Sequence, residues 1–229
     1  MQNRHYDCII IGAGVLGSFH AYHAAQMGLK VLLLEKDSQP MEATVRNFGM
    51  VIPSGMSQGK WQDYGRRSLE IYDDIQSRFD ITIRKQGSMY LASDTFEMTL
   101  LEELATINEK TGYTSRVTPK EDCLEKYAGL RASYCVGGLF FPDEVTIEPT
   151  RMIHHLIAYL KEKLDVQYRA QSLVKSVVYK NDRCIVETSD GAAFTGDQVI
   201  ICNGSEFRAL YPEKFFNSEI NFSRLYPFF

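Results

Sequence analysis

The chain has 229 residues, of which 25 are Lys or Arg and 29 are Asp or Glu, so its formal net charge is −4 at pH 7. Because there is no basic excess, nucleic acid is not an expected partner, and no apolar run reaches the ~18 residues that a membrane-spanning helix needs. The five cysteines show no metal-like pairing. They predict a reducing, cytoplasmic setting with no metal site, and the lack of a long apolar run predicts no membrane partner.

Residues 8–11 form a short apolar run, long enough for a buried strand, that leads directly into a glycine-rich turn. A helical pattern follows to Met27, and a second apolar run over residues 31–34 ends in Glu35. In dinucleotide-binding turns the glycines permit a tight bend, close approach of a pyrophosphate and helix packing, and an acid about 20 residues further on binds the ribose. The stretch therefore predicts a dinucleotide site and disfavours NADP. The turn, a G-x-G-x-x-G, consists of Gly12, Ala13, Gly14, Val15, Leu16 and Gly17.

A loop follows the second strand. It begins at Lys36 and passes through Arg46, Asn47, Phe48 and Gly49, and its glycine and proline content is not typical of a regular element. Two interpretations are open. The loop is either a surface connection that happens to carry an arginine, or a segment facing the cofactor, in which the arginine meets phosphate and the next backbone lies against a flat ring.

The rest of the chain alternates helical and strand patterns, and the parallel-sheet pattern is interrupted in the middle. We therefore predict an α/β fold with discontinuous domains: residues 1–82 and 147–210 form the dinucleotide domain, and residues 83–146 and 211–229 form a second, sheet-containing domain. Helices are expected over residues 58–79, 96–110, 119–127 and 149–164, and strands over residues 81–93, 133–147, 166–169, 172–179, 184–188 and 198–202.

The chain resembles the D-amino-acid oxidase and sarcosine oxidase (DAO) family of FAD-dependent oxidoreductases. The residues that carry the resemblance are GAGVLG with its following glutamate, TVRNFG, GGLFFPDEVTIEPTRMIHHL and VIICNGSE. It implies a doubly wound, glutathione-reductase-type domain that binds FAD, and an α+β substrate domain with a mainly antiparallel sheet. The implied reaction is oxidation of a C–N bond in a small amine or amino acid, with hydride transfer to flavin and oxygen as acceptor. Within the family, RNFGM is similar to a subgroup associated with aminophosphonate breakdown.

The resemblance also implies a set of cofactor-binding positions. It places a backbone contact to the adenine at Val174, and it places the strand that ends in Cys202, Asn203 and Gly204 near the flavin dinucleotide. No acid–base catalytic residue and no metal is implied. The full set comprises the six turn residues 12–17 with Glu35, Lys36, Arg46, Asn47, Phe48, Gly49, Val174, Cys202, Asn203 and Gly204.

Members of the resembled family are longer than this chain. The sequence therefore predicts a chain that lacks the C-terminal third, which would complete the substrate sheet. Three alternatives are open: a naturally compact variant, a catalytically inactive fragment and an NAD-linked Rossmann dehydrogenase. The oligomeric state is not predicted. The aromatic and apolar side chains expected to lack a covering core are Phe215, Phe216, Phe222, Leu225, Tyr226, Phe228 and Phe229.

Overall fold

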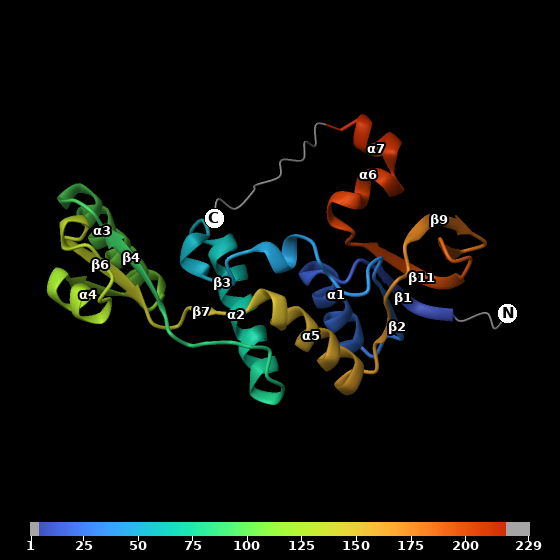
Figure 1. Cartoon of the computed structure of the whole chain (residues 1–229), viewed down its shortest axis with the longest axis horizontal. Coiled ribbons are helices and arrows are strands. Elements are labelled where there is room, and N and C mark those ends of the chain that lie inside the picture. The colour runs from blue at the N-terminus through green and yellow to red at the C-terminus, as the bar shows by residue number, and fades with distance from the viewer. Residues whose placement is uncertain (1–4, 219–229) are drawn as a thin grey trace. The chain divides into compact units, whose positions relative to one another are not determined.

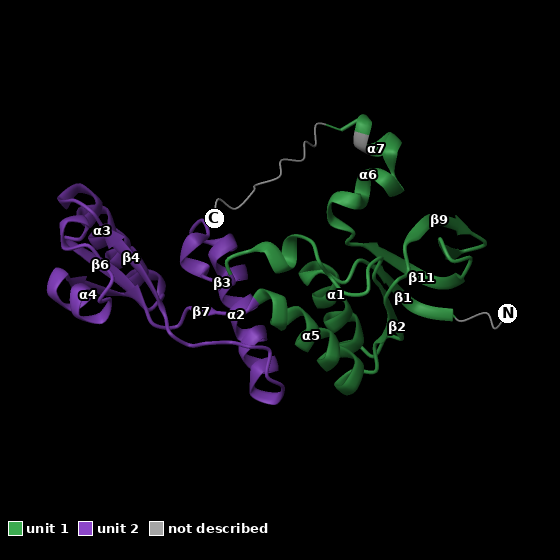
Figure 2. Cartoon of the chain, viewed as in Figure 1, with its two compact units in different colours: residues 1–48, 149–229 green, residues 49–148 purple. Residues whose placement is uncertain are grey.

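The computed structural model describes residues 5–218. The chain forms two compact units, one from residues 1–48 with 149–229 and the other from residues 49–148 (Figure 2). The sequence-based division placed residues 49–82 in the dinucleotide domain, whereas here they group with residues 83–148. Contacts between the two segments explain the grouping, because Met50 and Val51 pair with Thr146 and Val145, and the N–H of Ser54 donates to Glu144 Oε1 at 2.8 Å. As a division into functional domains, the sequence-based boundaries stay a prediction.

The first unit is built on a six-stranded sheet with the order β8-β2-β1-β11-β10-β9 (Figure 1). The strands β8, β2, β1 and β11 run parallel, and β10 and β9 continue the sheet as an antiparallel hairpin. Residues 8–11 of β1 and all of β2 are apolar and buried, as is typical of central parallel strands that are covered on both faces. The bounds are β1 His5–Ile11, β2 Val31–Leu34, β8 Gln167–Arg169, β9 Val174–Lys180, β10 Arg183–Thr188 and β11 Ala193–Ile201.

Two helices of this unit, α1 (Val15–Gln26) and α5 (Pro149–Lys163), lie beside each other and cover the parallel strands (Figure 1). The α1 helix approaches the sheet through small buried residues, Ala21 and Ala24 among them. An amphipathic stripe on α5 is buried, as its sequence pattern predicts. Short helical segments complete the unit: η1 (Ala43–Arg46), η4 (Gly204–Glu206), α6 (Phe207–Leu210) and α7 (Pro212–Phe216).

The second unit contains a three-stranded antiparallel sheet, β4-β6-β5, and a two-stranded ribbon, β3-β7. Its core gathers around Tyr113, Leu139 and Phe141. The predicted α/β fold class, with a second α+β part and antiparallel sheet, is confirmed. The elements are β3 Met50–Val51, η2 Pro53–Gly55, α2 Lys60–Arg78, β4 Ser88–Ala92, α3 Thr95–Thr111, β5 Arg116–Pro119, α4 Lys120–Lys126, η3 Ala132–Tyr134, β6 Gly137–Phe141 and β7 Val145–Thr146.

Two predicted strand regions of this unit differ from the structure. Residues 81–87 form no regular strand. The Gln76 side chain accepts the N–H groups of Ile81 and Ile83 at 2.9 and 3.1 Å, and Thr82 has a left-handed φ of 68°. The predicted pair within residues 133–147 does form two strands, β6 and β7, but each pairs elsewhere, β6 with β4 and β5 and β7 with β3.

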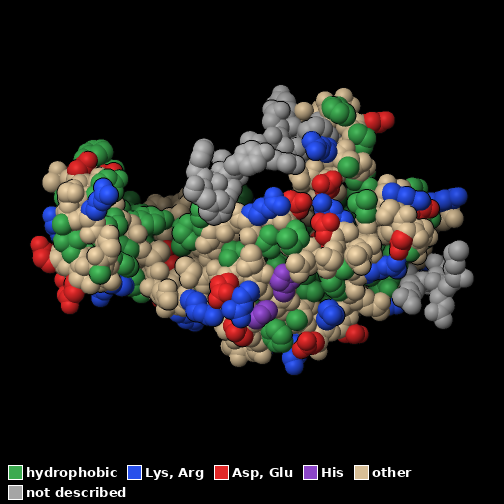
Figure 3. Space-filling model, viewed as in Figure 1, with side chains coloured by type: hydrophobic (Ala, Val, Ile, Leu, Met, Phe, Trp, Pro, Cys, Tyr) green, Lys and Arg blue, Asp and Glu red, His purple; other side chains and the backbone are tan. Residues whose placement is uncertain are grey.

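Acidic and basic side chains are interspersed over the face shown in Figure 3. Among residues 5–218, no helix is both long and apolar enough to cross a membrane. Of the tail residues expected to lack a core, Phe216 is 80% exposed. The side chain of Phe215 and residues Phe222, Leu225, Tyr226, Phe228 and Phe229 lie outside what the structure describes.

Candidate functional site

The glycine-rich turn joins β1 to α1. At two of its positions the surrounding backbone leaves no room for a side chain. Gly12 has a φ of +97°, and a Cβ there would lie 2.5 Å from the carbonyl oxygen of Cys202. A Cβ at Gly17 would lie only 1.8 Å from the carbonyl oxygen of Gly12. At Gly14 the nearest atom is the Thr44 hydroxyl, at 3.1 Å. The lack of a side chain at Gly14 therefore leaves room for the Thr44 hydroxyl beside the turn.

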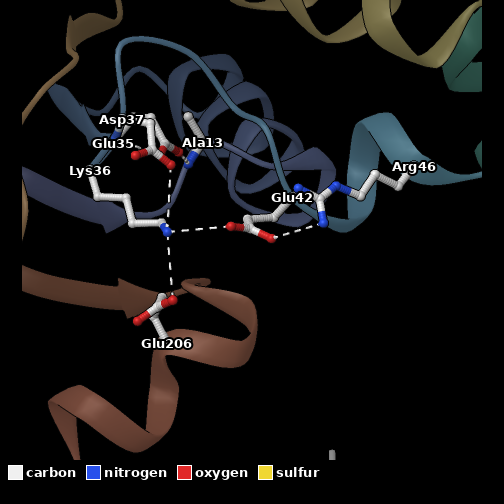
Figure 4. Close-up of polar contacts among 7 residues, drawn as sticks. All are labelled: Ala13, Glu35, Lys36, Asp37, Glu42, Arg46 and Glu206. Atoms are coloured by element: carbon white, nitrogen blue, oxygen red, sulfur yellow. Dashed lines mark hydrogen bonds and ion pairs between the residues drawn. The ribbon is translucent and has the colours of Figure 1, made fainter. Parts of the chain in front are cut away.

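Glu35 connects the end of β2 to this turn. Its side chain is buried, and its Oε2 accepts the N–H of Ala13 at 2.9 Å while Oε1 accepts the N–H of Asp37 at 3.1 Å (Figure 4). A carboxylate has about four acceptor positions, so these two bonds leave capacity for further donors such as a ribose diol. The predicted pairing of glycine turn and terminal acid is thus present as one connected arrangement.

Thr44 belongs to the same arrangement, and the sequence reasoning missed it. Its hydroxyl oxygen accepts the N–H of Val15, the first residue of α1, at 2.9 Å. The first N–H groups of a helix lack partners within the helix and carry partial positive charge, so they are places where an anion binds. Thr44 therefore brings the loop after β2 directly to the start of α1. The only available sequence signal was its position in TVRNFG, two residues before the predicted arginine.

Charged side chains surround Lys36 (Figure 4). Its Nζ lies 3.5 Å from a carboxylate oxygen of each of Asp37, Glu42 and Glu206. Burial by itself lowers the pKa of Lys36, but these three carboxylates outweigh that effect and hold the pKa above its usual value. Glu42 also reaches Arg46, whose Nη1 lies 3.9 Å from Glu42 Oε2. Lys36 and Arg46, both predicted to contact the cofactor, are thus linked through a glutamate that the sequence reasoning did not single out.

Two other predicted segments lie next to Glu35 and Gly12. The N–H of Ser172 donates to the carbonyl oxygen of Glu35 at 2.7 Å, which places the start of β9, at Val174, beside the end of β2. The N–H of Cys202 donates to the carbonyl oxygen of Ile11 at 2.7 Å, so the segment that begins at Cys202 lies next to the start of the turn. Burial raises the pKa of the Cys202 thiol, which makes it a packing group and a poor nucleophile.

The last predicted segment, residues 46–49, is only partly drawn into this arrangement. Asn47 donates from its side-chain amide to the carbonyl oxygen of Thr44, which tightens η1. Phe48 is 88% exposed. Gly49, with a φ of +67°, begins the second unit. The structure therefore brings Arg46 and Asn47 to the loop beside α1 and leaves the aromatic ring of Phe48 uncovered.

Together, the turn, Glu35, Val174 and residues 202–204 meet at the carboxyl ends of the parallel strands β1, β2 and β11. In open α/β sheets, ligands bind outside the carboxyl ends of such strands. The glycine turn, the remaining acceptor capacity of Glu35 and the start of α1 correspond to the pyrophosphate and ribose requirements of a dinucleotide. The fold and this edge of the sheet define a dinucleotide-binding oxidoreductase class.

Comparison with known proteins gives the family. The DAO family, described as "FAD dependent oxidoreductase", matches residues 7–228. The chain belongs to this family, whose members are FAD-binding flavoproteins, and the resemblance found in the sequence is confirmed. FAD is accordingly the dinucleotide to which the geometry of this edge corresponds.

The relatives are distant and longer. A probable oxidoreductase, OrdL, of Haemophilus influenzae is 28% identical, over 88% of this chain and 50% of its own length. The glycine oxidase of Bacillus subtilis is 24% identical, over 89% of this chain and 55% of its own. The crystal structure of glycine oxidase from Geobacillus kaustophilus superposes with a TM-score of 0.79 at 20% identity, over 93% of this chain and 59% of that one, and supports the fold. The chain spans about half the length of the curated relatives it matches.

Proposed function

We propose that this chain is the FAD-binding part of an oxidoreductase that oxidises the C–N bond of a small amine or amino acid, aminophosphonates included, with oxygen as electron acceptor. The observation that supports this most directly is the Glu35–Ala13 hydrogen bond, which joins the acid of β2 to the glycine turn at the carboxyl edge of the sheet. The substrate class is supported by family membership and by the name of the related glycine oxidase. In this proposal the protein acts in the cytoplasm.

The proposed roles combine the family resemblance with the geometry of the first unit. The start of α1 and the backbone at Gly14 would take the pyrophosphate, Glu35 the adenosine ribose, and Val174 the adenine through its backbone. Arg46 and Lys36 would supply positive charge, and residues 47–49 and 202–204 would border the flavin half. FAD itself would supply the redox chemistry, accepting a hydride from the carbon next to nitrogen, while the protein binds and orients.

Within the second unit, Tyr90 is the side chain we propose for contact with substrate. Its ring packs against Phe141 with centroids 5.1 Å apart, and its hydroxyl lies 2.9 Å from that of Ser54. Arg84 of the same unit is a weaker candidate, because it lies 3.6 Å from a carboxylate oxygen of Glu148 that balances its charge. Tyr90 thus offers a polar group held by a defined neighbour, and its replacement by Phe would keep the packing.

The test is to purify the chain and titrate it with FAD, following flavin fluorescence and the visible spectrum, with NAD and NADP as comparison ligands. We expect saturable binding of FAD at one site per chain, and no comparable response to the nicotinamide dinucleotides. Bleaching of bound flavin by glycine, sarcosine or 2-aminoethylphosphonate without air would then identify the substrate class. Failure to bind FAD, together with binding of NAD, would replace the proposal by the dehydrogenase alternative.

A further inference from the structure

Four charged residues form a chain of alternating sign in the first unit: Glu206, Lys36, Glu42 and Arg46 (Figure 4). Lys36 is well held by three carboxylates and its side chain is 28% exposed. Arg46 is 66% exposed and lies 3.9 Å from Glu42, at the long end of an ion pair. The two cations are therefore unequal: Lys36 is fixed among three acids, and Arg46 is held loosely by Glu42.

The loop that carries Arg46 lies at the start of α1, where a loosely held cation can contact a bound anion. Thr44 anchors the segment between Glu42 and Arg46 to the N–H of Val15, at the end of α1 that favours anions. A guanidinium prefers a phosphate that it can bind with two parallel hydrogen bonds over a long, solvent-exposed contact to a carboxylate. An anion arriving at the start of α1 would thus compete with Glu42 for Arg46. Glu42 would keep Lys36, to which its other oxygen is paired.

We propose that Glu42 is a positioning residue that holds Arg46 until an anionic ligand takes it by ion-pair exchange. The ligand class is a phosphate-bearing dinucleotide, so this inference rests on the proposed FAD site. Glu42 lowers the affinity for such ligands in two ways: it occupies Arg46, and it adds a negative charge near the phosphates. Its removal is therefore expected to tighten binding, opposite to the loss expected for a residue that contacts the ligand.

The chain offers a clean variant for this test. Glu42→Gln keeps the size of the side chain, and the Glu42 side chain makes no capping bond at the start of η1, so the helical turn does not depend on its charge. The backbone bond from the N–H of Val45 to the Glu42 carbonyl oxygen is retained. The matched control is Glu70→Gln, which removes the same charge from an exposed ion pair with Arg67 in the second unit.

The experiment measures the dissociation constants of FAD and of ADP for the wild-type chain, Glu42→Gln, Arg46→Gln, the double variant and Glu70→Gln. We expect Glu42→Gln to bind both ligands about two- to fivefold more tightly at low ionic strength, the size of effect typical of exposed charge pairs. The gain should shrink at roughly 0.5 M salt. It should be clearly smaller in the Arg46→Gln background, because there is then no guanidinium to release and only the loss of a negative charge remains.

Each outcome decides the proposal. Unchanged or weaker binding by Glu42→Gln, at an unchanged melting temperature, overturns it, as does an equal gain in Glu70→Gln or a gain that is undiminished without Arg46. If the wild-type chain binds neither FAD nor ADP, the proposed function fails first. If the wild-type chain binds both and Glu42→Gln gives no gain, only the exchange fails.

Discussion

Glu35 Oε2 accepts the N–H of Ala13 at 2.9 Å, so one buried hydrogen bond connects the end of β2 to the glycine turn that follows β1. The same carboxylate accepts the N–H of Asp37 with its other oxygen. The acid thus has two tasks in one position. It fixes the turn and the start of the following loop, and it keeps acceptor capacity for a ribose.

Replacing Glu35 by Gln tests both tasks. The amide can accept from only one of the two N–H groups, and its own NH₂ would face the other. It also loses the charge that strengthens hydrogen bonds from a ribose. We expect FAD binding to weaken by roughly 1–2 kcal/mol, the difference between charge-assisted and neutral bonds. Fluorescence titration measures this, with Glu187→Gln as the control because that glutamate pairs with Lys175 on the β9–β10 hairpin. An unchanged dissociation constant would contradict the ribose assignment.

Gly17 provides a prediction that is independent of any ligand. Gly17→Ala would place a Cβ 1.8 Å from the Gly12 carbonyl oxygen, so α1 must move away from the turn. We expect the free energy of unfolding to fall by about 3 kcal/mol or more. Gly191→Ala is the control: it is strained by a φ of +82° but has open space around it, so a loss of about 1 kcal/mol is expected. Urea denaturation compares the two, and equal losses would show that the turn relaxes easily.

The sequence predicted the parts of this protein whose causes are local. The glycine turn, Glu35 and the amphipathic stripe of α5 each follow from a short pattern with a known physical reason, and family resemblance supplied the fold. The contacts of Thr44 and Glu42 were not predicted, because they depend on how the loop after β2 folds back onto α1 and on where Glu206 is placed by β11. The periodicity of a sequence does not predict contacts between segments that are far apart in the chain.

The strand error over residues 81–87 has a related cause. Alternating apolar residues favour a strand, but here the Gln76 side chain takes two backbone N–H groups that a strand would have used. A side chain that competes for backbone donors overrides a weak local preference. The pairing of β6 and β7 with separate sheets likewise depends on partners that lie elsewhere in the chain.

Glu144 is the main buried polar residue of the second unit, and its removal should be costly. Its carboxylate is fully buried and accepts the N–H of Ser54 at 2.8 Å, the hydroxyl of Tyr113 at 2.7 Å and the hydroxyl of Ser88. Glu144→Ala leaves one buried donor and two half-buried donors without their partner, and a buried donor left unsatisfied costs ~1–3 kcal/mol, so we expect a loss of about 3 kcal/mol. Burial and the bond to Glu144 raise the pKa of Tyr113, so the phenol stays protonated and remains a donor at neutral pH.

Two comparisons make the Glu144 result interpretable. Glu125→Ala, an exposed site on α4, should change stability by less than about 0.5 kcal/mol. Glu144→Gln keeps one acceptor oxygen and should lie between the two. Amide hydrogen exchange should show the loss in residues 49–148 first. A Glu144→Ala protein as stable as Glu125→Ala would mean that water reaches these donors when the carboxylate is removed.

The alkaline stability of the first unit should depend on Tyr168, in β8. Burial and, to a lesser extent, the nearby charge of Glu35 raise the pKa of Tyr168 from 10.0 to about 12. The folded state therefore holds the phenolic proton more tightly than the unfolded state does. By linkage, this contribution to stability is fully present below pH 10 and is lost as the pH rises from about 10 to about 12. Tyr168→Phe removes the titrating proton, so its stability should fall less steeply over that window than that of the wild-type chain.

Urea midpoints measured at pH 8, 9, 10 and 11 compare the two slopes, with Tyr179→Phe, at an exposed site on β9, as the control. Parallel curves for Tyr168→Phe and wild type would show that Tyr168 titrates as a free tyrosine does, and that its contact with the Glu35 region is looser than the packing of β8 against β2 indicates.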